Sequence, residues 1–214
     1  MLVKICGLSS VDSLEAAISA GADMAGFVFF PKSPRHLELD RACVLGAIAA
    51  GRITKVAMLV DAPDDIIAGV TNSLRPDILQ LHGHETSARV AEIKARFRLP
   101  VMRAFGIFGR ADLATSIRDG ADADYLLFDA KPPASGLPGG NGVTFDWEIM
   151  TGMTFSRPWL LSGGLNCENV AKAIQLTQPR GVDVSSGVES SPGVKDNAKI
   201  REFVARSRNA RQTG

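Results

Sequence analysis

The stretch Met24-Ala25-Gly26-Phe27-Val28-Phe29-Phe30 decides the fold class, because no position in it carries a polar side chain. A strand with one face in water alternates polar and apolar residues. A strand that is apolar on both faces is buried on both, as the strands of a parallel sheet are. This stretch therefore predicts a buried strand of a parallel sheet that is covered by helices.

Outward from this stretch, short apolar strands alternate with helical patterns along the whole chain. We expect strands at about 2–6, 24–30, 53–60, 78–81, 101–105, 124–128, 158–161 and 181–184. We expect helices at about 11–20, 39–50, 63–73, 86–97, 111–118, 144–150, 168–176 and 195–208. This alternation implies right-handed crossovers between parallel strands. An open doubly wound sheet is the rival architecture, but regular units without a polar edge strand favour closure into a (β/α)8 TIM barrel.

The totals for the chain fit one domain of ordinary charge. Its 214 residues are 45% hydrophobic and 22% charged, with a formal net charge of +1. We expect a single barrel domain over 1–214, with about 206–214 as a frayed polar tail. The small net charge gives no reason to expect nucleic acid as a partner. No apolar run approaches the roughly 20 residues of a membrane span.

The three cysteines, Cys6, Cys43 and Cys167, are odd in number and lack CxxC spacing. This pattern argues against a disulfide framework or a zinc site and is typical of a reducing compartment. The chain also enters its first strand at once, without the regions of a signal peptide. We therefore expect a cytoplasmic location and no membrane partner.

In a (β/α)8 barrel, functional groups lie at the carboxyl ends of the strands. The loops Ser162–Asn166 and Asp183–Gly187 follow the seventh and eighth expected strands, where such barrels commonly bind phosphate. Glycines let backbone N–H groups approach phosphate oxygens. The candidate phosphate-binding residues are Gly163, Gly164, Ser185, Ser186 and Gly187. The alternative is that these glycines are only turn residues, and no P-loop motif indicates a nucleoside triphosphate.

Two strand-end groups could transfer protons. Cys6 ends the first strand, and Asp129 follows the sixth on the same face as Tyr125 and Leu127. A thiolate base and a carboxylic acid on either side of a small sugar suit general acid–base catalysis. Lys4 shares the face of Cys6, and an ammonium beside a thiol favours the thiolate. Cys6 could instead be a small buried hydrophobe, and Asp129 a loop cap paired with Lys131.

Four further residues are candidates for contacts with a substrate: Arg35, Gln80, His82 and Asp183. Arg35 follows the rigid Pro34, so its guanidinium could grip a carboxylate; an exposed arginine is the alternative. His82 shares a strand face with Gln80 and could equally be a satisfied histidine of the barrel. The histidines have no acidic partner at metal-ligand spacing, so we expect no metal site.

Several short blocks, in order from residue 4 to about 196, form a recognisable set. They are Lys4-Ile5-Cys6-Gly7-Leu8, Phe29-Phe30-Pro31-Lys32-Ser33-Pro34-Arg35, Gln80-Leu81-His82-Gly83, Phe128-Asp129, Gly140-Asn141-Gly142 with Thr144-Phe145-Asp146-Trp147, Ser162-Gly163-Gly164-Leu165-Asn166, and Gly181-Val182-Asp183-Val184-Ser185-Ser186-Gly187-Val188-Glu189. Together they cover nearly the whole chain, and the set resembles the phosphoribosylanthranilate isomerase family.

The resemblance implies a cofactor-free Amadori rearrangement in tryptophan biosynthesis. N-(5-phosphoribosyl)anthranilate would become 1-(2-carboxyphenylamino)-1-deoxyribulose 5-phosphate. By this resemblance, Asp129 is the general acid, Cys6 the general base, and Arg35 the partner of the anthranilate carboxylate. The two glycine-rich loops would hold the phosphate of this small phosphosugar, and the protein would be a monomer or a homodimer.

The sequence departs from the family pattern in two places. The third strand ends Met58-Leu59-Val60-Asp61, where the family more often has an aromatic residue and an asparagine. Cys167 stands where a proline commonly opens the seventh helix, and a thiol at a helix N-terminus can be acidified. Cys167 could therefore be alkylated alongside Cys6.

Three other functions compete with this interpretation. The related histidine-pathway sugar isomerase has a carboxylate where Cys6 stands and a clearer half-barrel repeat. A ribulose-phosphate epimerase needs metal ligands that the sequence does not offer. A non-catalytic phosphosugar-binding barrel would keep the loops but could lose Cys6 or Asp129. The loop 132–142 is long and glycine-rich, which is typical of either a lid or an ordinary surface loop.

Overall fold

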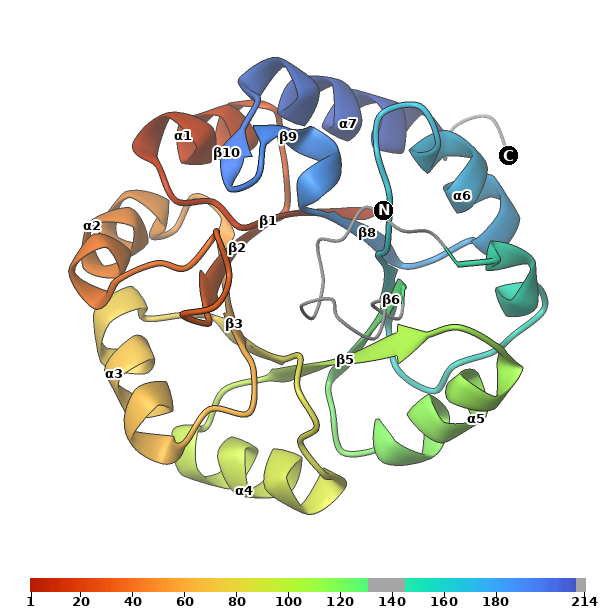
Figure 1. Cartoon of the computed structure of the whole chain (residues 1–214), viewed down its shortest axis with the longest axis horizontal. Helices are drawn as coiled ribbons and strands as arrows, with labels where there is room; N and C mark the ends of the chain where they lie inside the picture. Colours follow the sequence, from red (N-terminus) through yellow and green to blue (C-terminus); the bar gives the residue numbers. More distant parts are fainter. Residues whose placement is uncertain (131–144, 211–214) are drawn as a thin grey trace.

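A closed barrel of eight parallel strands forms the centre of the molecule (Figure 1). The structure, a computed structural model, describes residues 1–130 and 145–210. The strands are β1 Leu2–Cys6, β2 Met24–Phe29, β3 Thr54–Leu59, β4 Ile78–Leu81, β5 Val101–Ile107, β6 Tyr125–Ala130, β7 Trp159–Leu161 and β8 Gly181–Val184. Each strand pairs in parallel with the next, and β1 pairs with β8 to close the ring. The predicted (β/α)8 barrel is therefore confirmed.

Seven α-helices of the described residues surround the strands (Figure 1). They are α1 Val11–Ser19, α2 Leu39–Ala49, α3 Asp64–Leu74, α4 Ser87–Phe97, α5 Arg110–Asp119, α6 Val170–Thr177 and α7 Asn197–Ala210. Side chains of Ser10 and Thr86 accept the N–H groups of Ser13 and Arg89, which fixes where α1 and α4 begin.

The short helix expected at about 144–150 is present over its described part, as a 3-10 helix and not an α-helix. The structure has there a 3-10 helix, η1, at Trp147–Met150, begun by Asp146, whose side chain accepts the N–H of Glu148. A segment this short commonly adopts the tighter 3-10 form. Lys131, the loop 132–142 and the start of the predicted helix at Thr144 lie outside the described residues.

The sequence predicted a frayed tail from about residue 206, and this prediction is wrong up to Ala210. Helix α7 runs to Ala210, and its Ser207 and Ala210 are buried. Arg208 donates to the Met1 carbonyl oxygen and to Asp23 Oδ2, the latter at 2.7 Å. The arginines in this segment suggested a solvated end, whereas one of them ties the helix to the start of the chain.

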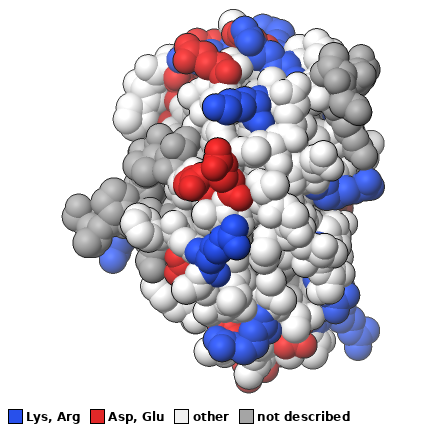
Figure 2. All heavy atoms as spheres, turned by 90° about the vertical axis from the view of Figure 1, so that its right-hand side faces the viewer, with Lys and Arg blue, Asp and Glu red and all other residues white. Residues whose placement is uncertain are grey.

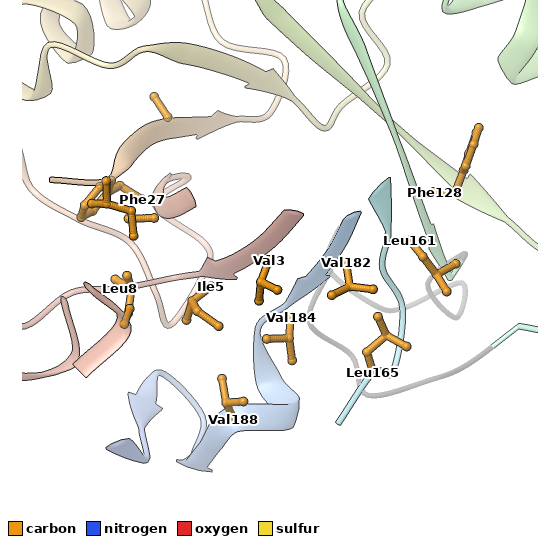
Figure 3. Packing of buried hydrophobic residues seen from close by; sticks show 14 of the residues in the cluster. Val3, Ile5, Leu8, Phe27, Phe128, Leu161, Leu165, Val182, Val184 and Val188 are labelled. Carbon is orange, nitrogen blue, oxygen red and sulfur yellow. The ribbon is translucent and has the colours of Figure 1, made fainter. Parts of the chain in front are cut away.

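Two apolar layers stabilise the barrel. Outward-facing residues pack between the strands and the helices, and Figure 3 shows Val3, Ile5, Val182 and Val184 gathered on β1 and β8. Inward-facing residues fill the lower part of the barrel: Met24, Val56, Ile78, Met102, Ala104, Leu127 and Leu160. Each fully buried large side chain contributes about 1.5–3 kcal/mol by removal from water. The polar inward-facing groups lie between this apolar layer and the carboxyl ends of the strands.

A short hairpin that the sequence did not predict lies between β8 and α7. It consists of the 3-10 helix η2 Ser186–Val188 and the antiparallel strands β9 Glu189–Ser191 and β10 Val194–Lys195. Its turn contains Gly193 with φ +83°, a conformation that favours glycine. The last helix, predicted from about Lys195, begins at Asn197, because Asp196 accepts the N–H groups of Ala198 and Lys199.

On the face shown in Figure 2, Lys and Arg lie interspersed with Asp and Glu, so that face presents no field of one sign. Over 1–130 and 145–210, every helix is too short or too polar to cross a bilayer.

Candidate active site

A polar cavity opens at the carboxyl end of the barrel. Its lining residues come from six of the eight strands and from the loops after β2, β4, β7 and β8: Cys6, Val28, Ser33, Arg35, Met58, Gln80, His82, Asp129, Ser162, Asp183 and Ser185. The sequence-predicted residues Cys6, Arg35, Gln80, His82, Asp129, Asp183 and Ser185 are all among them. Gly163, Gly164, Ser186 and Gly187 stand in the loops beside this cavity and do not line it.

Cys6 points into the barrel from the end of β1 and is buried, with 6% of its surface exposed. Burial raises the pKa of the Cys6 thiol, and the charge of Lys4 offsets only part of this effect. Gly26 on β2 makes room for the thiol, because a Cβ there would lie 3.0 Å from Cys6 Sγ. A thiol of raised pKa is a stronger base once it is ionised.

Lys4 is fully buried below Cys6 and pairs with Asp183 across β1 and β8. Its Nζ lies 2.9 Å from Asp183 Oδ1. Burial would lower the pKa of Lys4, but the charges of Asp183 and Cys6 outweigh it and raise this pKa. The charge of Lys4, taken by itself, lowers the pKa of the Cys6 thiol, which is the predicted direction. Burial and the charge of Asp183 both raise the pKa of the thiol and outweigh this contribution.

Asp129 lies near the end of β6, on the inward face with Leu127, and its side chain is 7% exposed. Its Oδ1 accepts the N–H of Ala130 at 2.9 Å. Its Oδ2 lies 3.4 Å from Nε2 of His82. The other nitrogen of that ring, Nδ1, lies 3.2 Å from Nε2 of Gln80. Gln80, His82 and Asp129 therefore form a chain across one side of the cavity.

Arg35 is buried at the cavity wall and has a carboxylate partner that the sequence did not predict. Its Nε and Nη2 donate to the two carboxylate oxygens of Glu189 at 2.7 and 2.8 Å. Lys195 Nζ lies 2.7 Å from Glu189 Oε1, so two cations share one carboxylate. Gly7 leaves space for the arginine, since a Cβ there would approach Arg35 Cδ to 2.7 Å. The alternative of an exposed Arg35 is wrong.

The pKa values of Glu189 and Lys195 are both shifted in this cluster. Burial opposes ionisation of Glu189, but the hydrogen bond from Arg35 and the charge of Lys195 lower the pKa of this carboxyl. Burial lowers the pKa of Lys195 in spite of the adjacent Glu189. Sequence reasoning missed Glu189 and Lys195 as site residues. A signal existed in the block that ends Val188-Glu189, which placed an acid close to the predicted phosphate loop.

The two glycine-rich loops lie against each other. A Cβ on Gly187 would come within 1.9 Å of the Leu165 carbonyl oxygen, and Gly163 and Gly164 have φ values of +87° and +64°. Side chains of Asn166 and Asn169 accept the N–H groups of the turn before α6. Within the described residues, no hydrogen bond uses the N–H of Gly163 or Gly164, so these donors remain available to an anion.

Asp61, one of the two departures from the family pattern, occupies a left-handed turn after β3. Its φ is +46°, a region that asparagine and aspartate tolerate better than most residues. Its Oδ1 accepts the N–H of His84 at 2.6 Å. The departure is therefore a conservative one, and Asp61 shapes a loop beside the cavity without lining it.

Cys167, the other departure, is not acidified. Helix α6 begins at Val170, so Cys167 precedes its first turn. Burial and the charge of Glu202 raise the pKa of the Cys167 thiol. Cys43 is the exposed cysteine.

In the described part of the chain, His, Cys, Asp and Glu side chains form no group of three that could hold a metal ion. The cavity instead brings together the Asp129 carboxyl group, the Cys6 thiol of raised pKa and buried cations, with the two glycine-rich loops beside it. This set suits proton transfer on an anionic substrate.

Comparison with known proteins places the chain in a family. The family model described as N-(5'phosphoribosyl)anthranilate (PRA) isomerase matches residues 3–206. An N-(5'-phosphoribosyl)anthranilate isomerase of Nitrobacter winogradskyi is 56% identical over 211 residues, covering 98% of this chain and 94% of that protein.

Solved structures agree with this match. Phosphoribosyl anthranilate isomerase from Thermotoga maritima superposes with a TM-score of 0.88 at 33% identity, covering 98% of this chain and 99% of that one. A structure of this isomerase in complex with reduced 1-(o-carboxyphenylamino)-1-deoxyribulose 5-phosphate has a TM-score of 0.83 at 30% identity, covering 98% and 100%. The chain therefore belongs to the N-(5'-phosphoribosyl)anthranilate isomerase family.

Proposed function

We propose that this protein converts N-(5-phosphoribosyl)anthranilate into 1-(2-carboxyphenylamino)-1-deoxyribulose 5-phosphate in tryptophan biosynthesis. The observation that carries the proposal is the presence of Cys6 and Asp129 in one cavity of a barrel that the family model matches over 3–206. The complex of a related isomerase with a reduced form of this product supports the substrate class.

Asp129 acts first, as the general acid. Its Oδ2–H gives a proton to the furanose ring oxygen, and the bond between that oxygen and C1 breaks. The lone pair of the anthranilate nitrogen forms the C1=N bond at the same time, which yields a protonated Schiff base. Asp129 is left as a carboxylate.

Cys6 then acts as the general base. Its thiolate takes the proton from C2 of the sugar, and the electrons of that C–H bond form a C1=C2 bond. The electrons of the C=N bond return to nitrogen, so the iminium charge is neutralised and an enolamine results. Movement of the O2 proton to C1 gives the ketone. Substrate and product are isomers, and the proton lost by Asp129 matches the one gained by Cys6, so this route uses no cofactor.

The remaining candidate residues hold the substrate. Glu189 binds Nε and Nη2 of Arg35. Nη1 has no hydrogen-bond partner within the described residues, so it can bind the anthranilate carboxylate. Lys195 offsets the charge of Glu189, so this wall stays cationic. The phosphate would bind the N–H groups and hydroxyls of Gly163, Gly164, Ser185, Ser186 and Gly187. Gln80, His82 and Asp183 would contact the sugar.

The direct test mixes purified protein with freshly prepared phosphoribosylanthranilate and follows the loss of its fluorescence, with and without a metal chelator. We expect turnover at the same rate in both. Turnover of the histidine-pathway substrate instead, or turnover of neither substrate, would contradict the proposal. Binding without turnover would indicate a non-catalytic phosphosugar-binding barrel. Gel filtration with light scattering decides between the monomer and the homodimer, either of which the proposal allows.

A further inference from the structure

His82 contacts the carboxyl group to which the proposed function assigns the proton. Its Nε2 lies 3.4 Å from Asp129 Oδ2, and the two side chains are only 10% and 7% exposed. The mechanism above uses His82 only as a substrate contact and so leaves this approach unexplained.

The two oxygens of Asp129 have different surroundings. Oδ1 accepts the Ala130 N–H at 2.9 Å, so the backbone of β6 fixes it as an acceptor. Oδ2 faces His82 and is therefore the oxygen that can carry the proton destined for the sugar. Whatever orients Oδ2 sets the direction of the proton transfer.

Gln80 contacts the far side of the same ring and can set which nitrogen carries the proton. Its Nε2 lies 3.2 Å from His82 Nδ1, while its Oε1 is buried without a hydrogen-bond partner among the described residues. A buried amide oxygen left unpaired is costly, and a turn of the amide would exchange its two ends.

The two amide orientations match the two states of the acid. With the amide N–H on Nδ1, the ring proton sits on Nε2 and points at an ionised Oδ2. With the amide oxygen on Nδ1–H, Nε2 carries a lone pair and accepts the O–H of a protonated Oδ2. Each of the two arrangements uses one tautomer of the ring in the same position.

We propose that His82 is a positioning residue that holds the Oδ2 of Asp129 towards the sugar ring oxygen, with Gln80 selecting its tautomer. This inference rests on the proposed function, in which Asp129 is the acid. On this inference, His82 stabilises the transition state by orienting Asp129. It does not act as a contact that binds substrate and transition state equally well.

The test separates kcat from KM in His82→Leu and its conservative counterpart His82→Gln. We expect His82→Leu to lower kcat by roughly 10- to 100-fold, as loss of orientation does, with KM changed less than about threefold. His82→Gln keeps a polar amide at this position and should recover part of kcat. The matched control is His84→Leu, because His84 makes a similar contact, 3.2 Å from Asp61 Oδ2, while its side chain is 95% exposed. Its kinetics should equal those of the wild type.

A second readout repeats His82→Leu in an Asp129→Asn background. If His82 acts through Asp129, His82→Leu should lower kcat by less than about twofold in this background. The reason is that effects of residues that act as a unit are not additive. A rise in KM with unchanged kcat, or a full loss in the Asp129→Asn background, overturns the inference. If His82→Leu does not fold, Gln80→Leu answers the same question, with a smaller kcat loss that must also vanish beside Asp129→Asn. Wild-type kcat in Asp129→Asn alone would instead remove the acid, and with it the proposed function.

Discussion

Groups around Cys6 shift the pKa of its thiol in opposite directions, and single substitutions can test each direction. Burial raises the pKa of its thiol, Lys4 lowers it, and Asp183 raises it. The wild-type enzyme should therefore lose kcat/KM as pH falls through a value above the ordinary thiol pKa of about 8.5.

Substitutions of the buried pair should move this acid limb in opposite directions. Lys4→Met removes a cation and should shift the limb to higher pH, whereas Asp183→Asn removes an anion and should shift it to lower pH. The pH dependence of kcat/KM measures both. Lys94→Met is the control, because Lys94 pairs with Asp124 at 3.0 Å on the surface. Profiles that coincide with the wild type in both variants would refute a role of this pair in tuning Cys6.

Residue by residue, strand alternation predicted the inward positions well. Cys6, Gln80, His82, Asp129 and Asp183 all reach the cavity, because a period of two leaves little freedom once the strands are known. The ionisation of Cys6 was harder to predict, since it depends on burial and on the charge of Asp183 from another strand. Glu189 was missed because its partner, Arg35, is 154 positions away in the chain.

At the scale of elements, the β9–β10 hairpin joins the second and eighth strand-end loops. Gly193 packs close to the Pro34 carbonyl, which a Cβ would approach to 2.6 Å, and Glu189 holds Arg35 of the same loop. The strands and most helices could be predicted from apolar periodicity. This hairpin could not, because Glu189–Ser191 and Val194–Lys195 are short, polar and ordered by contacts distant in sequence.

The hairpin should make stability sensitive to acid. The pKa of Glu189 is lowered in the folded protein, so its contribution is present above the unfolded value of about 4.3 and is lost as pH falls through the folded value. Glu189→Gln leaves two buried cations without their anion and should cost about 3–5 kcal/mol of unfolding free energy at pH 7. That difference from the wild type should shrink towards pH 3.

Urea unfolding at a series of pH values measures this dependence. Glu15→Gln is the matched control, because Glu15 makes the same two-bond contact with Arg52, at 2.6 and 2.8 Å, on the exposed surface. Its effect at pH 7 should be far smaller. A Glu189→Gln curve parallel to that of the wild type over the whole range would show that the hairpin pair does not carry acid sensitivity.

For the whole molecule, closure of the barrel joins the two ends of the described chain. Strand β1 pairs with β8, and α7 packs beside α1 (Figure 1). Arg208 links α7 to the Met1 and Gly21 carbonyl oxygens and to Asp23. The closed ring itself could be predicted from the eight repeated units, whereas this polar link could not, because the arginines of α7 are indistinguishable in sequence.

Arg208→Met should therefore destabilise the whole barrel by about 1.5–3 kcal/mol, the usual worth of hydrogen bonds to a charged group. Arg206→Met should cost less than about 1 kcal/mol, because Arg206 pairs with Glu202 on the exposed face of the same helix. Equal unfolding midpoints in urea for the two variants would contradict this role of Arg208.

In the proposed mechanism, Asp129 gives a proton to the furanose ring oxygen and Cys6 takes one from C2 of the sugar. The most direct measurement is steady-state turnover of phosphoribosylanthranilate by Cys6→Ser and Asp129→Asn, with Cys43→Ser as the exposed-cysteine control and circular dichroism to verify folding. Each active-site variant should lose roughly 10²- to 10⁴-fold in kcat, while the control keeps the wild-type rate. Near wild-type turnover by a folded Cys6→Ser or Asp129→Asn protein would contradict the account.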